Sequence, residues 1–490
     1  MHTTTSPAAP DHASCYAALA ARDARFDGAF FTGVTSTGIY CRPVCPAKTP
    51  RAQSCTFFHS AAQAEAAGFR PCLRCRPELA PYALQQNLAH AVWQRIAAGA
   101  LNDGDVEQLA LEVGLSSRQL RRVLLQHFGV SPVELAQTQR LLFAKKLLQE
   151  TQLPIADVAF AAGFGSVRRF NTLFAERYRM APSALRRAGG AAGAAEQLSL
   201  RLAYRPPFDW PRMLRYLAAR AIAGVEAVEG ETYARTVRLA GAEGWIRVSH
   251  DAARDQLVVA LAPALAGVLM PLLARVRTQF DLDAHPAVIA AHFAADPLLG
   301  PVTARTPGLR VPGAFDPFEL AIRAILGQQV SVAGASTIAG RMAARFGTAL
   351  DQPIGSLTHH FPDAARLSAC TVDDIAPLGM PGSRAQTVLA MAAFAASGGL
   401  NVAPGTSLAD AVARLRTVRG IGEWTAQYIA LRALRYPDAF PAGDLALQKA
   451  AAPDGGRLTE KQLLAVAAPW APWRGYAALA LWHSLTKETT

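Results

Sequence analysis

The sequence predicts a multidomain, mainly α-helical protein, and three observations lead to that prediction. The chain has 490 residues, enough for roughly three or four domains at about 150 residues each. Apolar residues recur at three- and four-residue spacing from about Tyr82 to Arg187 and again from about Phe315 onward, as on one face of a helix. Between these segments, the uncharged run 188–195 contains only Ala and Gly and indicates a linker.

A division into five segments follows from these changes in composition. Short β-prone pieces surround paired cysteines at the start of the chain, and the segment after the linker mixes strand-like runs at 245–248 and 257–260 with an amphipathic helix at 213–223. We expect a small α+β domain at 1–81, a double helix-turn-helix domain at 82–187, a flexible linker at 188–196, a small α/β domain at 197–305 and a helical domain at 306–490.

The charge of the chain favours a polyanionic partner. The net charge is +12, and residues 118–187 alone hold twelve Lys or Arg against four Asp or Glu. No uncharged apolar run reaches the roughly 18 residues that a membrane span needs, and the first residues lack the pattern of a secretory signal. We therefore expect a protein of the cytoplasm, associated with the nucleoid and with no membrane partner.

Four of the seven cysteines form two short chelating pairs, Cys41–Cys45 and Cys72–Cys75. Four thiolates suit one tetrahedral Zn²⁺, so the pattern predicts a zinc site. One interpretation is a purely structural zinc knuckle. In the other, the net negative charge of the site keeps a sulfur nucleophilic toward an alkyl group. Nearby arginines could hold a phosphate backbone; they are Arg42, Arg51, Arg70, Arg74 and Arg76.

The residues around these cysteines resemble the methylphosphotriester-repair domain of Ada-type regulators. The resemblance rests on Thr37-Gly-Ile-Tyr-Cys-Arg-Pro-Val-Cys45 and on Ala67-Gly-Phe-Arg-Pro-Cys-Leu-Arg-Cys75. It implies that Cys41 accepts a methyl group from a DNA phosphotriester, as a catalytic residue that is also a zinc ligand.

Two helix-turn-helix units follow, each with a Gly turn, at Gly114 and Gly163. Ser116 and Gln119 predict a capping box at the start of the second helix of the first unit. Two basic copies at this spacing look like the AraC family of transcription factors, and the resemblance implies that the second helix of each unit reads DNA. The expected contacts are Arg118, Arg121, Arg122, Arg168 and Arg169.

A helix-hairpin-helix motif lies in the C-terminal segment, at Leu415-Arg-Thr-Val-Arg-Gly-Ile-Gly422. Its glycines allow a tight turn that presents backbone N–H groups to a DNA phosphate. Further along, Phe440-Pro-Ala-Gly-Asp444 places a carboxylate on a Gly/Pro loop ahead of a helix. A carboxylate suits cleavage of a glycosidic bond, because it stabilises an oxocarbenium-like state.

The stretch from Leu198 to Trp482 resembles the 3-methyladenine DNA glycosylase II (AlkA) family. Besides the hairpin, the resemblance rests on Pro206-Pro-Phe-Asp-Trp210, on Ala324-Ile-Leu-Gly-Gln-Gln-Val-Ser331 and on Pro472-Trp-Arg-Gly-Tyr476. It implies excision of alkylated bases by Asp444, without a cofactor in this half. The aromatic residues expected around a flipped base are Trp424, Tyr428, Trp482, Tyr216 and Tyr476, and the expected DNA contacts are Val418, Gly420, Gly422 and Gln329.

The chain departs from the family pattern at three positions. Trp424 stands where members with lyase activity carry a Schiff-base Lys, which predicts a monofunctional glycosylase. Gln329 replaces the apolar wedge, and Leu445 replaces an aromatic residue after the catalytic Asp. Which residue fills the gap left by a flipped base stays open.

The favoured interpretation is thus a fused DNA-alkylation-repair protein, with a zinc methyl acceptor, an AraC-type regulator and a glycosylase. Double-stranded DNA, both alkylated and carrying an operator, is the expected partner, with RNA polymerase as a further one. The alternative is a transcription factor whose glycosylase-like half only senses damaged DNA.

Overall fold

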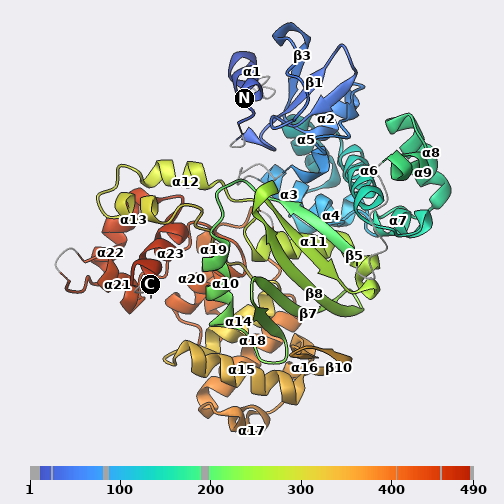
Figure 1. Ribbon diagram of the computed structural model, residues 1–490. Helices are drawn as coiled ribbons and strands as arrows, with labels where there is room; N and C mark the ends of the chain where they lie inside the picture. The colour runs from blue at the N-terminus through green and yellow to red at the C-terminus, as the bar shows by residue number, and fades with distance from the viewer. Residues whose placement is uncertain are drawn as a thin grey trace.

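The computed structural model describes residues 11–23, 26–80, 88–188, 198–403, 405–452 and 455–485. A small cysteine-bearing part lies at one end of the molecule, next to the helix-turn-helix units (Figure 1). A central antiparallel sheet and a large helical part complete the chain, in agreement with the predicted multidomain, mainly helical fold. None of the described helices is both long and apolar enough to cross a membrane.

The cysteine-bearing part is built on a four-stranded sheet with the order β3-β1-β2-β4. Strand β1 pairs antiparallel with β2 and β3, whereas β4 runs parallel to β2. This pairing brings Cys41, at the end of β2, close to the turn that follows β4. The elements are α1 (His12–Ala20), β1 (Phe31–Val34), β2 (Ile39–Cys41), β3 (Cys55–Phe58), α2 (Ala61–Ala66) and β4 (Arg70–Pro71).

Two helix-turn-helix units flank one long helix, as predicted. The capping box of the first unit is present: the Ser116 side chain accepts from the Gln119 N–H, and the Gln119 side chain accepts from the Ser116 N–H. In the second unit, the Ser166 side chain caps the corresponding helix. The elements are α3 (Leu88–Ala97), α4 (Val106–Glu112), α5 (Ser117–Phe128), α6 (Pro132–Glu150), α7 (Ile155–Ala161), α8 (Val167–Tyr178) and α9 (Pro182–Ala188).

The central sheet has the order β5-β9-β8-β7-β6, and every pair is antiparallel. The strands predicted at 245–248 and 257–260 lie within β8 and β9. The helix predicted at 213–223 instead spans Trp210–Ala218. It begins at Trp210 because the Asp209 side chain caps it and accepts from the Arg212 N–H at 3.0 Å. The elements are β5 (Leu198–Ala203), α10 (Trp210–Ala218), β6 (Glu226–Glu229), β7 (Thr232–Leu239), β8 (Ala242–Asp251), β9 (Gln256–Leu261) and α11 (Leu269–Gln279).

Within its described residues, the C-terminal part contains helices and one β-hairpin that the sequence analysis did not predict. Strands β10 and β11 pair around a turn in which Gly355 has a φ of +60°, a conformation that favours glycine. The helices are α12 (Pro286–Phe293), α13 (Leu299–Arg305), α14 (Pro317–Leu326), α15 (Val332–Phe346), α16 (Ala364–Ser368), α17 (Val372–Ile375), α18 (Gly382–Ala396), α19 (Leu408–Arg416), α20 (Glu423–Arg432), α21 (Leu445–Ala450), α22 (Glu460–Ala467) and α23 (Arg474–Leu485). The hairpin strands are β10 (Thr348–Ile354) and β11 (Leu357–His360).

The predicted linker at 188–196 lies, apart from Ala188, outside the described residues. The segments on its two sides are in direct contact. Apolar side chains of the second helix-turn-helix unit, such as Val158 and Phe174, belong to the same buried cluster as Leu200 and Leu257 of the central sheet. The two segments therefore share a hydrophobic core, which the sequence analysis did not anticipate.

Buried charges join the end of α6 to both of its neighbours. The Glu150 side chain is fully buried and accepts from Arg76 of the cysteine-bearing part. It also accepts from Lys146 at 3.2 Å and from the backbone N–H of Arg201, on β5, at 2.8 Å. One carboxylate thus connects three segments that are far apart in the sequence.

We predict that Glu150→Ala destabilises the protein markedly. The substitution leaves Lys146 buried without its carboxylate, and breaking a buried ion pair costs about 3–5 kcal/mol. Urea unfolding followed by tryptophan fluorescence should show an earlier transition. The matched control is Glu112→Ala, whose carboxylate is 45% exposed beside Arg95 and should cost at most about 1 kcal/mol. Equal midpoints for the two variants would contradict the prediction.

Candidate active site and metal centre

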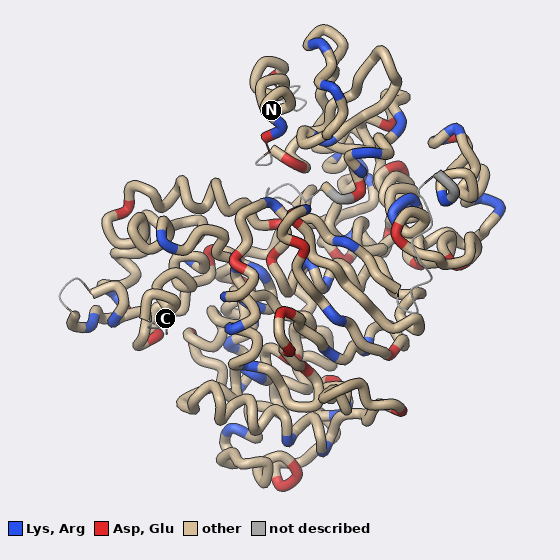
Figure 2. The backbone as a smooth tube through the Cα atoms, viewed as in Figure 1, with Lys and Arg blue, Asp and Glu red and all other residues tan. Residues whose placement is uncertain are grey.

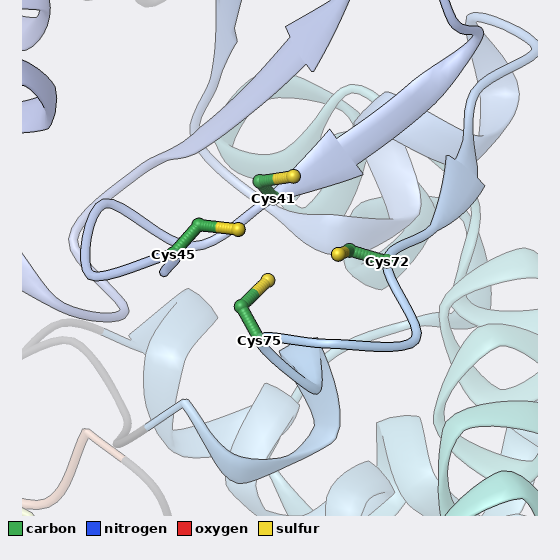
Figure 3. Close-up of side chains that lie close together, drawn as sticks. All are labelled: Cys41, Cys45, Cys72 and Cys75. Atoms are coloured by element: carbon green, nitrogen blue, oxygen red, sulfur yellow. The ribbon is translucent and has the colours of Figure 1, made fainter. Parts of the chain in front are cut away.

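The four predicted cysteines meet in one cluster. Their Sγ atoms all lie within 4.8 Å of one another, and Figure 3 shows the side chains of Cys41, Cys45, Cys72 and Cys75 directed toward a common centre. Four thiolates at Zn–S distances of about 2.3 Å make a closed tetrahedral site. The residues present therefore fit the single Zn²⁺ that the spacing predicts.

Cys41 is the most accessible member of this cluster. It is half-buried, whereas the other three cysteines are buried. Cys41 also lines a cavity of about 340 Å³, together with Lys48, Arg70 and Arg74. A thiolate at this position can meet a substrate while the surrounding cations hold an anion.

Two of the five arginines predicted to hold phosphate have other partners, which corrects the prediction for them. Arg42 is buried in an ion pair with Asp27. Arg76 pairs with Glu78 and with Glu150. Asp27 and Glu150 lie 15 and 74 residues from their partners, so local spacing gave no sign of them, whereas Glu78 is only two residues from Arg76.

The five arginines predicted to read DNA are all exposed. Three lie on α5 and two on α8, the second helix of each unit. Figure 2 shows basic residues on the α8 segment at the edge of the molecule. Their contact with DNA stays a prediction.

Asp444 is the N-cap of α21, and four N–H groups hold its carboxylate. Oδ1 accepts from the backbone N–H groups of Ala446 at 2.9 Å and Leu447 at 3.0 Å, and from the indole of Trp482 at 3.2 Å. Oδ2 accepts from the indole of Trp424 at 3.0 Å. The carboxylate is thereby fixed in direction, and Oδ2, with one such bond, keeps capacity to accept from water.

Asp444 opens into a cavity of about 910 Å³ that is lined by four of the five predicted aromatic residues. The rings of Trp424 and Tyr428 are stacked, 5.4 Å apart and 11° from parallel. The rings of Trp482 and Tyr428 lie edge to face with their centres 6.3 Å apart. Tyr216 of α10 is the fourth aromatic residue that lines the cavity. Aromatic faces beside a carboxylate suit a flat ligand that is bound through its π-system.

Two other predicted site residues lie where the sequence analysis did not expect them. Tyr476 is buried with its hydroxyl 2.7 Å from Asp281, and it does not line this cavity. The Val418 side chain is buried in the core, whereas Gly420 and Gly422 of the hairpin turn are exposed. Leu445 is 59% exposed beside the cavity rather than inside it.

Gln329 lies at an exposed turn between α14 and α15 with a φ of +54°. Its neighbour Gln328 donates to the carbonyl of Gly420 at 3.2 Å and to Thr425 at 2.9 Å. This turn is therefore attached to the hairpin, on the same surface. The role of Gln329 in DNA binding remains a prediction.

The sequence analysis missed the cations of the cavity wall. Arg220 and Arg432 both line the cavity, and each lies four residues after a predicted tyrosine. Arg432 follows Tyr428 on α20, and Arg220 follows Tyr216 in the turn directly after α10. Residues four apart share a helix face, so the spacing held a signal that could have found them.

Comparison with known proteins agrees with this arrangement. Over 484 residues, the chain is 40% identical to a protein of Mycobacterium tuberculosis described as a probable bifunctional transcriptional activator/DNA repair enzyme AlkA, and the match covers 97% of each chain. The chain belongs to this AlkA family. Family models match the AlkA-family chain in four places: the metal binding domain of Ada at 14–78, a helix-turn-helix domain at 109–188, the AlkA N-terminal domain at 199–316 and the HhH-GPD superfamily of base excision DNA repair proteins at 322–466.

Two further relatives match the C-terminal part of this AlkA-family protein. The DNA-3-methyladenine glycosylase 2 of Escherichia coli is 37% identical over 283 residues, which are 58% of this chain and 96% of the relative. The solved structure of a 3-methyladenine DNA glycosylase from Archaeoglobus fulgidus aligns with a TM-score of 0.51 at 19% identity, over 58% of this chain and 99% of that chain. The second likeness supports the fold alone.

Proposed function

We propose that the protein repairs alkylated DNA and that its C-terminal half excises alkylated bases of the 3-methyladenine type, with Asp444 as the catalytic residue. One observation carries the proposal: a carboxylate fixed by four N–H donors opens into a large cavity lined by Trp424, Tyr428 and Trp482. The proposed damage enters this cavity by base flipping. The hairpin turn at Gly420 and Gly422 holds a DNA phosphate through backbone N–H groups.

The chemistry follows from this geometry. A cationic alkylated base stacks on the Trp424–Tyr428 pair and gains a cation–π attraction of roughly 0.5–2 kcal/mol. When the glycosidic bond breaks, its electrons leave with the base, and the sugar becomes oxocarbenium-like. The Asp444 carboxylate stabilises that charge and orients the water that adds to the sugar carbon. Preorganisation by the indole and backbone donors means that the carboxylate need not turn during the reaction.

We also propose that the N-terminal half transfers a methyl group from a DNA phosphotriester to Cys41. The sulfur–carbon bond forms as the carbon–oxygen bond breaks, and the bonding electrons remain on the phosphate, which leaves as a diester anion. Lys48, Arg70 and Arg74 line the cavity beside Cys41 and favour that anion. Cys41, Cys45, Cys72 and Cys75 would hold the Zn²⁺, which would keep their thiols deprotonated.

The same half acts as a sequence-specific regulator of transcription through the exposed arginines of α5 and α8. Its proposed partners are double-stranded DNA and RNA polymerase.

We propose that the domains span residues 1–81, 82–187, 197–305 and 306–490. The protein acts on DNA in the cytoplasm, at the nucleoid.

Asp444→Asn should abolish base excision while damaged DNA still binds. The amide loses the charge that stabilises the sugar, and removing one such group costs on the order of 10²–10³ in rate. Single-turnover release of 3-methyladenine is measured beside a gel shift. The matched control is Asp438→Asn, because Asp438 pairs with Arg474 and does not line the cavity; it should excise at nearly the wild-type rate. Base release at the wild-type rate in Asp444→Asn would contradict this role for Asp444. No base release by the wild-type protein would favour the alternative, a half that only senses damage.

The glycosylase should be monofunctional. Among the described residues that line the cavity there is no lysine, and an imine with the sugar needs a neutral amine. Borohydride added during turnover on alkylated duplex DNA should therefore trap no covalent protein–DNA complex. A glycosylase with lyase activity on its own substrate serves as the positive control. A trapped complex that survives denaturing electrophoresis would show that an amine attacks the sugar.

Methylphosphotriester DNA should add one methyl group to the protein, on Cys41. Mass spectrometry of the intact protein and of its peptides measures the addition. Cys41→Ser should take up no methyl group, whereas the matched control Cys55→Ser should behave like the wild type, because Cys55 is a buried thiol outside the cluster. Zinc bound with no methyl uptake would leave the cluster a structural site only.

A further inference from the structure

Tyr216, Tyr428 and Arg432 form one hydrogen-bonded group in the wall of the base cavity. Nη1 of Arg432 donates to both phenol oxygens, at 2.7 Å to Tyr428 and at shorter range to Tyr216. The two phenol oxygens are 3.4 Å apart. Arg432 itself is buried and donates through Nε to the carbonyl of Pro312. The guanidinium is thus held in place and cannot easily leave the two phenols.

The hydrogen bonds of the two phenols leave one phenol O–H able to donate to a ligand in the cavity. Both phenol oxygens accept from Arg432, so each phenol keeps its own O–H to donate. The contact between Tyr216 and Tyr428 uses one of these two protons at most. At least one O–H can therefore donate to a ligand in the cavity that both rings line.

Tyr216 is the stronger donor of the two. The guanidinium of Arg220 lies 3.8 Å from the centre of its ring, and that of Arg432 lies 4.9 Å away. Burial raises the pKa of Tyr216, but Arg432 and Arg220 outweigh burial and lower the pKa to about 8. For Tyr428, burial dominates and raises the pKa. A more acidic phenol forms the stronger hydrogen bond to an acceptor that gains negative charge.

We propose that Tyr216 determines which bases this cavity can release: its O–H donates to a ring nitrogen or carbonyl oxygen of a flipped purine and supports the departure of damaged purines that are electrically neutral. The proposal rests on the proposed function, in which this cavity holds the base. A cationic alkylated base leaves as a neutral molecule, so no negative charge develops on it that a donor would have to stabilise. A neutral base leaves with both electrons of the glycosidic bond as an anion, and it takes up a proton from solvent afterwards. A donor aimed at the base stabilises that anion as it forms.

The test is Tyr216→Phe, assayed by single-turnover release of two bases from duplex DNA: 3-methyladenine as the cationic substrate and hypoxanthine as the neutral one. A hydrogen bond to a group that becomes charged is worth on the order of 10- to 100-fold. Hypoxanthine release should fall by that factor more than 3-methyladenine release does, because phenylalanine keeps the aromatic ring and loses only the O–H donor. The matched control is Tyr436→Phe, a half-buried tyrosine that donates to the carbonyl of Thr406 outside the cavity; it should follow the wild type on both bases.

A pH profile supplies a readout that a packing role would not change. Above a pKa of about 8 the Tyr216 proton is lost, so wild-type hypoxanthine release should decline as the pH rises through that value, and the decline should be missing in Tyr216→Phe. The charged and titratable groups that face Tyr216 are Arg220 from the turn after α10, Arg323 from α14, and Tyr428 and Arg432 from α20. His483 also lines the cavity, but burial lowers its pKa to about 4, so it does not titrate in this range.

The outcomes separate this proposal from the proposed function. Equal losses on both bases in Tyr216→Phe would make the residue a packing element and overturn the proposal, as would no loss on either base. Release of 3-methyladenine without any release of hypoxanthine by the wild-type protein would overturn it as well. Full activity of Asp444→Asn would instead contradict the proposed function, whatever Tyr216→Phe does.

Discussion

The arrangement of the whole molecule depends on buried charges that need partners from other segments. Lys145 is fully buried on α6, and its ammonium lies 2.5 Å from Glu78 and donates to the carbonyl of Cys72 at 3.2 Å. Four residues after Lys146, Glu150 connects α6 to Arg76 and to β5. Removing one member of such a set leaves a charge buried alone, which is among the most costly defects in a protein. Helix α6 thus holds the cysteine-bearing part, the helix-turn-helix units and the central sheet in one arrangement.

A second connection of this kind runs from the cysteine cluster to the central sheet. The backbone N–H of Arg42, next to Cys41, donates to Sγ of Cys75 at 3.3 Å, and its guanidinium pairs with Asp27. The carbonyl of Asp27 accepts two bonds, at 3.0 and 2.8 Å, from Arg205, which follows β5 and is 2% exposed. The residues that position a zinc ligand are therefore in direct contact with the glycosylase half. The cysteine-bearing part and the glycosylase half are thus packed against each other.

Sequence alone predicted the features whose signals are local. The cysteine pairs, the capping box at Ser116 and the Gly/Pro loop before Asp444 each lie within a few residues, so spacing carries the information. The β10–β11 hairpin and the cavity arginines were missed although their signals are local, whereas the other failures concern contacts between distant positions. Tyr476 turned out to bind Asp281, 195 residues away, and Arg76 to bind Glu150, 74 residues away. No periodicity reports such pairs, and the same reason explains the shared core on the two sides of the predicted linker.

The two tryptophans of the cavity show why the sequence-level description of this site was incomplete. Trp424 and Trp482 were predicted as flat surfaces for a base, yet each also donates its indole N–H to Asp444. Phenylalanine offers the surface without the donor, and tyrosine carries its hydroxyl at the far end of the ring. Indole alone combines a wide face with an N–H on its edge, so one side chain can bind the base and direct the carboxylate together. Under the proposed function, base binding and catalysis depend on the same two side chains, which limits how far the base specificity can change while the Asp444 carboxylate keeps its position.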